Sequence, residues 1–252
     1  MMRIRLCLIS AALFAACLGA SAQQVPNMNF DQWSKKGGCW NPWAKDSQNP
    51  AWDTANHGLS LLGVNGASPE YEHVAVKGPG KAAAKLETRQ VLGILAGGSI
   101  FTGKFLKVVR MSGAKMSFGV PFTGRPKSLS GYIHYIPGKI DVASKELSGL
   151  KGATDNATIE ISLKDSGPLV LDTTDENFSR HDGAGAPNTV GYGVKHFKEE
   201  TKGYIRFEIP IEYRSGHTPT HIVIVATSSR YAQQFTGSTD SVMYLDELQL
   251  NY

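Results

Sequence analysis

All four tryptophan residues lie within one stretch of 20 residues near the start of the chain: Trp33, Trp40, Trp43 and Trp52. Tryptophan rings stack on the apolar faces of ligands such as sugars, because C–H groups meet the negative face of the π-system. Neighbouring polar side chains then satisfy the hydroxyl groups. Tryptophan is also highly buried on average, so a place in the core is the alternative for each ring. The stretch therefore indicates a ligand-stacking surface, a tryptophan-rich part of the core, or both.

The acidic residues give no clear sign of a hydrolytic pair. Most glycosidases use two carboxyl groups about 5–9.5 Å apart, one protonated as the acid and the other ionised as nucleophile or base. Two carboxylates at period-two spacing on a strand project to one side, but the triplet Glu-x-Asp-x-Glu is absent. Glu208 and Glu212 are separated by a segment that contains Pro210. A hydrolase built on this chain would therefore need carboxylates from separate strands.

Asp246 lies in an alternating segment at the end of the chain. Period-two counting places it on one face with Tyr244 and Leu248, and places Glu247 on the other face. A carboxylate on an apolar face needs a partner. The alternatives are an arginine such as Arg125, a set of backbone or hydroxyl donors, or a calcium ion, which prefers oxygen ligands. Asp246 is therefore a candidate metal ligand as well as a candidate for an internal hydrogen bond.

Other kinds of chemistry find no support in the motifs. The chain has no Gly-x-Ser-x-Gly elbow, phosphate loop or dinucleotide fingerprint, so we expect no organic cofactor. Pro219 between His217 and His221 argues against a helical pair of metal ligands. Cys39 lacks the local signature of a thiol enzyme and is interpreted as a small, partly buried residue. Scattered lysines without a basic helix give no footprint for nucleic acid.

Short strands bounded by turn residues must position these side chains. The clearest alternation runs from Tyr204 to Ile211, and the apolar run from His221 to Ala226 is typical of a strand covered on both faces. The remaining predicted strands lie at residues 72–77, 82–88, 101–110, 115–120, 129–136, 159–164, 169–172 and 242–252. About ten such strands predict an all-β fold, a jelly-roll β-sandwich of two antiparallel sheets.

Glycine-rich segments are interpreted as loops. The segment from Asp172 to Lys202 is rich in Gly, Asp and Asn and is predicted to be the least structured part, either a loop over a site or an exposed ornament. The triplet Phe-Thr-Gly occurs three times without a common period, ending at Gly103, Gly124 and Gly237. We expect each of these glycines to supply the positive φ of a turn.

The first 22 residues have the pattern of a signal peptide. Basic residues from Met1 to Arg5 precede an apolar stretch, and the small residues Ala20-Ser21-Ala22 suit cleavage before Gln23. Cys17 in Phe-Ala-Ala-Cys offers the alternative of a lipid anchor. The stretch is too short to span a bilayer, and no later run reaches the roughly 20 apolar residues of a membrane helix. We therefore expect export to the periplasm or outer cell surface and one domain over residues 23–252.

Several motifs together resemble one known family. They are Phe30-Asp31-Gln32-Trp33, Trp52-Asp53-Thr54-Ala55-Asn56, Ser99-Ile100-Phe101-Thr102-Gly103, Phe118-Gly119-Val120-Pro121-Phe122 with Arg125-Pro126, Gly131-Tyr132 with Tyr135, and Ser228-Ser229-Arg230 through Phe235-Thr236-Gly237 to Tyr244-Leu245-Asp246-Glu247. In this order they resemble the putative carbohydrate metabolism domain family of gut bacterial envelope proteins. The resemblance implies a β-jelly-roll, an envelope location and a role in glycan binding or breakdown. Members often carry an additional N-terminal module, which we do not expect in this shorter chain.

The resulting hypothesis is an exported protein that binds a polysaccharide or oligosaccharide and works with surface glycan-uptake partners. The candidate sugar-binding residues are Trp43, Trp52, Asn56, Arg125, Tyr135 and Arg230. Tyr135 has the alternative of filling the core, and Arg125 that of pairing with an internal carboxylate. The competing hypotheses are a glycoside hydrolase with carboxylates from separate strands, and a structural or adhesive surface subunit. A structural calcium at Asp246 is the one ion considered.

Overall fold

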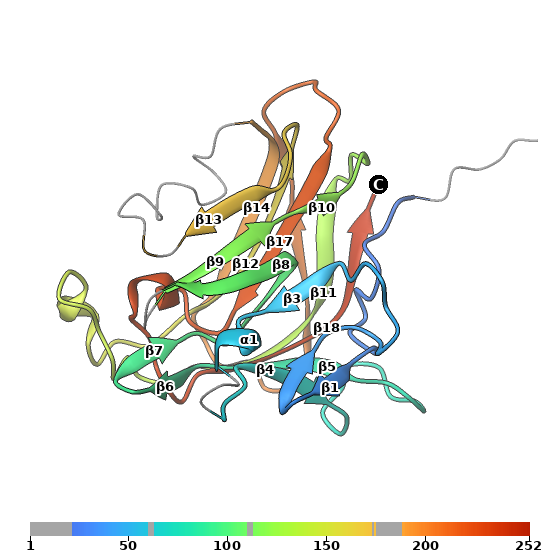
Figure 1. Cartoon of the computed structure of the whole chain (residues 1–252). Coiled ribbons are helices and arrows are strands. Elements are labelled where there is room, and N and C mark those ends of the chain that lie inside the picture. Colours follow the sequence, from blue (N-terminus) through green and yellow to red (C-terminus); the bar gives the residue numbers. More distant parts are fainter. Residues whose placement is uncertain (1–21, 60–62, 110–112, 173, 175–187) are drawn as a thin grey trace, which may run out of the picture.

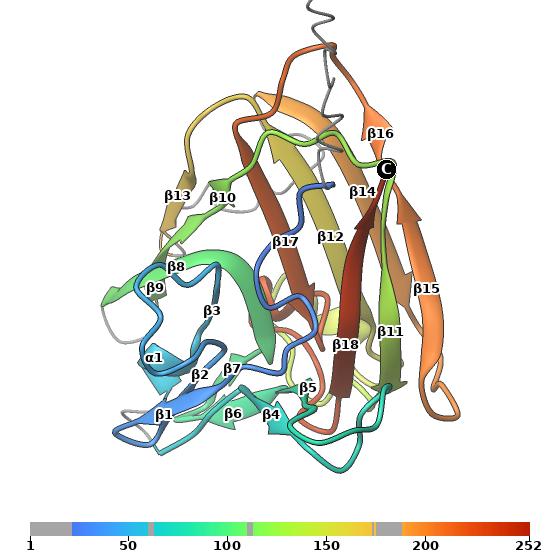
Figure 2. The same ribbon diagram turned by 90° about the vertical axis from the view of Figure 1, so that its right-hand side faces the viewer.

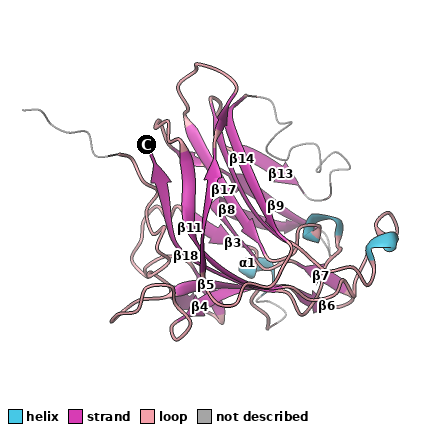
Figure 3. Cartoon of the chain, turned by 180° about the vertical axis from the view of Figure 1, so that it is seen from behind, coloured by secondary structure: helices cyan, strands magenta, loops and turns pink. Residues whose placement is uncertain are grey.

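A computed structural model describes residues 22–59, 63–109, 113–172, 174 and 188–252. Residues 1–21 of the predicted signal peptide, with Cys17, lie outside these residues. Strands make up almost all of the regular structure, as the magenta arrows of Figure 3 show. The helical elements in the described part are α1 (Asn56–Leu59) and the 3₁₀ turns η2 (Ser148–Leu150) and η5 (Ala232–Gln234). None of the described helices is long and apolar enough to cross a membrane. The all-β class predicted from the strand pattern is confirmed.

The larger of the two main sheets has nine strands. They are β3 (Trp52–Thr54), β8 (Ser99–Val109), β9 (Gly113–Phe118), β10 (Val120–Pro121), β12 (Ala157–Lys164), β13 (Leu169–Asp172), β14 (Thr189–Phe197), β16 (Glu212–Tyr213) and β17 (His221–Thr227). Their order is β13-β9-β8-β17-β12-β14-β16, with β10 beside β17 and β3 beside β8, and every pairing is antiparallel. Most of this sheet lies above α1 in the view of Figure 1.

The second sheet has five strands and faces the first. They are β4 (Ala67–Glu70), β5 (Ala83–Glu87), β11 (Ser128–Ile136), β15 (Ile205–Pro210) and β18 (Val242–Asn251), in the order β15-β11-β18-β5-β4. Two hairpins stand apart from both sheets, β1 (Ser34–Lys36) with β2 (Cys39–Asn41) and β6 (Arg89–Val91) with β7 (Ile94–Ala96). Figure 2 shows β17, β12 and β14 opposite β18, β11 and β15, which is the sandwich that the strand pattern predicted.

The core lies between the sheets and follows the period of two. Ile159 and Ile161 of β12 point into it from the large sheet, and Leu129 and Ile133 of β11 point into it from the other sheet. All four side chains are fully buried. Trp52 of β3 packs there as well. Burial of such apolar area contributes roughly 25 cal/mol per Å², which makes this layer the main source of stability.

Two predictions about local structure are wrong, and glycine explains one of them. β14 lies inside the segment that was predicted to be the least structured part, and it pairs with β12 and β16 near one edge of the large sheet. Gly193 permits this because a Cβ atom there would lie 2.5 Å from the carbonyl oxygen of Pro210. Glycine marks close backbone approach here and not a loop. Residues 72–77, in contrast, form bends and irregular structure in place of the predicted strand.

The three Phe-Thr-Gly triplets also depart from their predicted role. Gly103 has a φ of 139°, but it lies within β8 and not in a turn. In the third triplet the positive φ of 52° belongs to Phe235 and not to Gly237. Gly124 has no positive φ. The shared letters therefore serve different backbone conformations.

A bulge in β18 corrects the face predicted for Asp246. Glu247 has a φ of 48°, and the register with β11 shifts by one residue at this point. As a result Leu248 points into the core, whereas Asp246 lies on the outer face of the sheet with Tyr244. Period-two counting fails here because a bulge inserts one residue and reverses the alternation beyond it.

Candidate functional site

A hollow of about 260 Å³ opens on the outer face of the nine-stranded sheet. Its sheet side is formed by Phe101 of β8, Phe118 of β9 and Val225 of β17. These residues lie outside the core because they alternate with core residues such as Ile100 and Ile224. The other walls come from α1, the β6–β7 hairpin and η5, and Figure 2 shows α1 and this hairpin on the same side of β8. We call this hollow the sheet pocket.

The lining of the sheet pocket is mainly apolar and aromatic. The rings of Phe101 and Phe118 pack at 4.8 Å between centroids, and Phe105 of β8 lies beside them. Polar side chains occur on the turn after β17, where Arg230 and Gln233 line the pocket and are exposed. No aspartate or glutamate is among the described lining residues. Phe101 is almost completely buried, whereas Phe105 and Phe118 are half-buried. The pocket therefore offers the rings of Phe105 and Phe118 for stacking, together with hydrogen-bond donors and without a carboxylate pair.

Arg230 is held by its backbone while its charged group stays accessible. Its N–H donates to the carbonyl oxygen of Asn156 at 2.7 Å. The guanidinium lies over the ring of Tyr231, 5.1 Å from the centroid. Within the described residues no carboxylate pairs with it. A guanidinium presents several N–H donors in a planar fork, so this group is suited to bind ligand oxygens beside the pocket.

A row of rings connects Trp43 to the sheet pocket. Its ring stacks on His57 at 6.2 Å between centroids and an angle of 24°. The His57 ring lies 6.0 Å from that of Phe105, which lines the pocket. Trp43 is half-buried. The structure therefore places two of the predicted residues, Trp43 and Arg230, at or near the sheet pocket.

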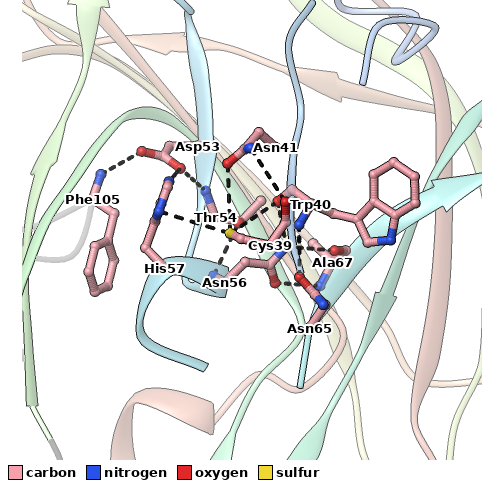
Figure 4. Close-up of polar contacts among 10 residues, drawn as sticks. All are labelled: Cys39, Trp40, Asn41, Asp53, Thr54, Asn56, His57, Asn65, Ala67 and Phe105. Carbon is pink, nitrogen blue, oxygen red and sulfur yellow. Dashed lines mark hydrogen bonds and ion pairs between the residues drawn. The ribbon is translucent and has the colours of Figure 1, made fainter. Parts of the chain in front are cut away.

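His57 also lies between Cys39 and Asp53, as Figure 4 shows. These are residue types of thiol hydrolases, but the distances are 3.9 Å from Cys39 Sγ to His57 Nδ1 and 3.7 Å from His57 Nε2 to Asp53 Oδ1. Cys39 is buried, and its thiol faces oxygen atoms of Trp40 and Asn41, both at 3.7 Å. Oxygen acceptors around a buried sulfur favour the neutral thiol over the thiolate. The group is therefore a structural network, consistent with the interpretation of Cys39 as a buried residue.

Asp53 and Asn56 connect this network to the backbone of β8, β2 and β4. The Asp53 carboxylate accepts hydrogen bonds from the N–H groups of Thr54 at 2.7 Å and Phe105 at 2.8 Å. Burial raises the pKa of Asp53, although these two donors lower it. Asn56 donates to the carbonyl oxygens of Trp40 and Ala67 and accepts from two backbone N–H groups. With its amide fully used inside the protein, Asn56 positions α1 and is not placed to bind a sugar.

Trp52 and Tyr135 occupy the core. The Trp52 indole donates to the carbonyl oxygen of Pro26 at 2.8 Å and packs edge-on against Phe30 at 5.1 Å. The Tyr135 hydroxyl donates to the carbonyl oxygen of Ser228 at 3.1 Å. Both residues are almost completely buried. The alternative given for each, a core position, matches their placement.

Arg125 lies apart from the sheet pocket. Its guanidinium donates to the carbonyl oxygens of Ser215 and His217 and lies 4.1 Å from the centroid of the Tyr213 ring. It does not contact Asp246, so the suggested pairing of these two residues is wrong. The side chain ties the loop after β16 to the segment before β11. It is exposed but already has partners.

Asp246 lies on the outer face of the five-stranded sheet. Its carboxylate accepts hydrogen bonds from the N–H groups of Ala75 at 2.7 Å and Glu247 at 2.8 Å. Burial raises its pKa to about 6. The nearby Asp31 and Glu247 carboxylates share the ammonium of Lys81 at 3.0 and 2.9 Å. Among the described residues no cluster of three or more His, Cys, Asp or Glu side chains is arranged to hold a metal ion, and the calcium site stays a prediction.

The aromatic lining of the sheet pocket was missed as a binding surface by sequence reasoning. Phe101 and Phe118 stood in the resemblance motifs but were assigned no role, because their strands read only as core candidates. The β6–β7 hairpin was not predicted at all. The pair Leu92-Gly93 forms its two-residue turn, with φ values of 51° and 80°. The sequence signal for this turn was Gly93, because such turns favour glycine.

The fold is a β-sandwich, and the sequence places it in a carbohydrate-related family. A sequence model of the family described as "Putative carbohydrate metabolism domain" matches residues 29–251, so the chain belongs to this family. The resemblance drawn from the motifs is thereby confirmed. No curated protein matches the chain.

Two solved structures from gut bacteria share the fold. One is described as a putative glycoside hydrolase from Bacteroides thetaiotaomicron; it has 21% sequence identity and a TM-score of 0.67, and the match covers 89% of this chain and 70% of that one. The other is a putative glycoside hydrolase from Bacteroides vulgatus, with 20% identity and a TM-score of 0.61, over 88% of this chain and 96% of that one. At this identity the likeness concerns the fold.

Proposed function

We propose that the protein is exported and binds glycans at the bacterial envelope, without cleaving them, through the sheet pocket. The observation that carries this proposal is the pocket itself: aromatic rings from two neighbouring strands, an accessible arginine beside them, and no carboxylate among the described lining residues. Stacking supplies affinity for a sugar face, whereas hydrolysis by the usual route needs two carboxyl groups. The signal-peptide pattern of residues 1–22 supports export.

Each part of the pocket has a role in this proposal. Phe105 and the neighbouring Trp43–His57 stack present ring edges and faces to the sugar. Arg230 and Gln233 donate to its hydroxyl oxygens, which fixes the orientation of the ligand. Glycan captured in this way is passed to partners of a surface uptake apparatus.

Arg230→Ala provides the first test. Purified residues 23–252 are screened on a glycan array with and without calcium, and the affinity of the best ligand is measured by calorimetry. We expect Arg230→Ala to weaken binding by at least about tenfold, because hydrogen bonds to a charged group contribute about 1.5–3 kcal/mol. Arg125→Ala is the matched control. It removes an exposed arginine that contacts Tyr213 instead of the pocket, and it leaves the affinity unchanged.

The same experiment separates the competing functions. Product analysis of the bound glycan shows an intact ligand if the protein only binds, and a shortened one if it is a hydrolase. If no glycan on the array binds in either condition, the proposal is wrong and a structural or adhesive role takes its place. Equal loss of affinity in both arginine variants would place the site elsewhere.

A further inference from the structure

The mouth of the sheet pocket carries exposed apolar side chains. Leu92 is 75% exposed, Val108 41% and Phe235 38%, and all three line the pocket. They come from three separate elements: the β6–β7 turn, the end of β8 and the residue after η5. Scattered single apolar residues are normal on a surface, but several gathered around one concavity mark an interaction site.

Two of these residues are also held in an unfavourable backbone conformation. Leu92 has a φ of 51° and Phe235 a φ of 52°. Bulky residues rarely adopt this left-handed region, where glycine and asparagine are preferred. The first position of a turn such as Leu92-Gly93 usually holds Asn, Asp or Gly. Both backbone positions serve the fold, since Leu92 forms the β6–β7 turn and Phe235 ends η5, but neither position requires a large apolar side chain. Such a side chain, exposed and conformationally disfavoured, points to a ligand.

The chemistry of the lining limits what can enter the pocket. The hydroxyl groups of a sugar ring would meet the side chains of Phe101, Met116 and Phe118 on the sheet side, which offer no strong hydrogen-bond partner. Burying hydroxyls without partners costs about 1–3 kcal/mol each in proteins.

Resting on the proposed function, we propose that the ligand is a glycan that carries an apolar acyl or aryl substituent. The substituent enters the sheet pocket and is clamped by Leu92, Val108 and Phe235. The sugar to which it is attached stays at the mouth, where Arg230 and Gln233 bind its oxygens. This placement of the substituent and the sugar matches the lining of the pocket, which is apolar on the sheet side and polar on the turn after β17.

A series of alkyl β-D-glucopyranosides tests the substituent. Methyl, butyl and hexyl glucoside are titrated below their micelle concentrations into residues 23–252 by calorimetry. We expect the affinity to rise about three- to fourfold for each methylene group added. Leu92→Ala lowers the affinity for hexyl glucoside by at least about fivefold and hardly affects methyl glucoside. Ile205→Ala, which removes an aliphatic residue of β15 that is 44% exposed and lies outside the pocket, leaves both unchanged.

Leu92→Asn guards against a loss of binding that merely reflects misfolding. Asparagine tolerates a positive φ, so this variant should unfold at the same temperature as the wild type or higher, and it should still bind hexyl glucoside at least about fivefold more weakly. Affinity independent of chain length overturns the inference, and the proposed function survives if array glycans still depend on Arg230. If hexanol binds as tightly as hexyl glucoside, the sugar contributes nothing and the inference is also wrong.

Discussion

At the scale of single residues, the structure separates polar side chains that support the fold from those that remain accessible. The side chains of Asn56 and Asp53 are hydrogen-bonded to backbone groups, and Arg125 donates to two carbonyl oxygens. Arg230 has the same charge as Arg125 but no such partners within the described residues. The local sequence does not distinguish the two arginines, because the difference lies in which distant carbonyls surround each guanidinium.

Asp246 makes stability depend on pH. In the unfolded chain an aspartate has a pKa of about 3.9, whereas burial raises the pKa of Asp246 to about 6. The folded protein therefore binds more protons than the unfolded chain between these values. The resulting contribution to stability is present below about pH 4 and is lost as the pH rises through 6, by up to about 3 kcal/mol.

Asp246→Asn should remove this pH dependence, because its amide does not titrate. We expect the free energy of unfolding of the wild type, relative to that of the variant, to fall by about 2–3 kcal/mol from pH 4 to pH 7. Urea denaturation of both proteins at the two pH values measures the difference. Parallel pH profiles would show that the Asp246 carboxyl has an ordinary pKa.

At the scale of elements, irregular backbone positions decide which face of a sheet a side chain occupies and how neighbouring strands pair. The bulge at Glu247 moves Asp246 to the outer face of its sheet. In the other sheet, Gly103 lets β8 run against β9 with the register Gly103 to Phe118. A Cβ atom at Gly103 would lie 2.1 Å from the carbonyl oxygen of Ser117. This pairing brings Phe118 beside Phe101.

Gly103→Ala should therefore damage both stability and the pocket. The methyl group collides with fixed backbone at a φ of 139°, so we expect the free energy of unfolding to fall by about 2–4 kcal/mol. Glycan binding should weaken as β9 moves. Gly216→Ala is the control, since a Cβ atom there meets nothing within 4 Å. Urea unfolding of both variants makes the measurement, and equal stabilities would contradict the role given to Gly103.

At the scale of the whole molecule, the first residues of the described chain cover the part of β18 that β5 does not reach, since β5 pairs only with residues 242–245. The Gln24 side chain both donates to and accepts from the backbone of Leu250, at 2.7 and 2.8 Å. The N–H of Leu248 donates to the carbonyl oxygen of Met28. Figure 1 shows this blue segment running beside the red strand β18, with the two ends of the described chain close together.

Removing residues 23–28 should leave these backbone groups of β18 without partners. We expect the free energy of unfolding to fall by at least about 3 kcal/mol, at about 1–3 kcal/mol for each of the three unsatisfied groups. Thermal and urea unfolding of residues 29–252 and 23–252 test this. Gln24→Ala should give a smaller loss of the same sign. If the shortened chain is equally stable, residues 23–28 do not contribute to the stability of the sheet.

The sequence by itself determined the class of fold, because a period of two with glycine and proline at the ends of each run specifies strands over short distances. It also determined the family, through motifs spread over the whole chain. It misjudged β14, where glycine served close packing, and the face of Asp246, where one inserted residue reversed the alternation.

Only the tertiary structure decided where the sheet pocket forms. Phe101, Phe118 and Arg230 are far apart in sequence, and they meet because β8 pairs with both β9 and β17. Alternation shows that a strand has two faces, but not what covers the face turned away from the core. That depends on where α1, η5 and the β6–β7 hairpin pack. Such contacts are long-range, and they left Trp52 in the core while placing Trp43 beside the pocket.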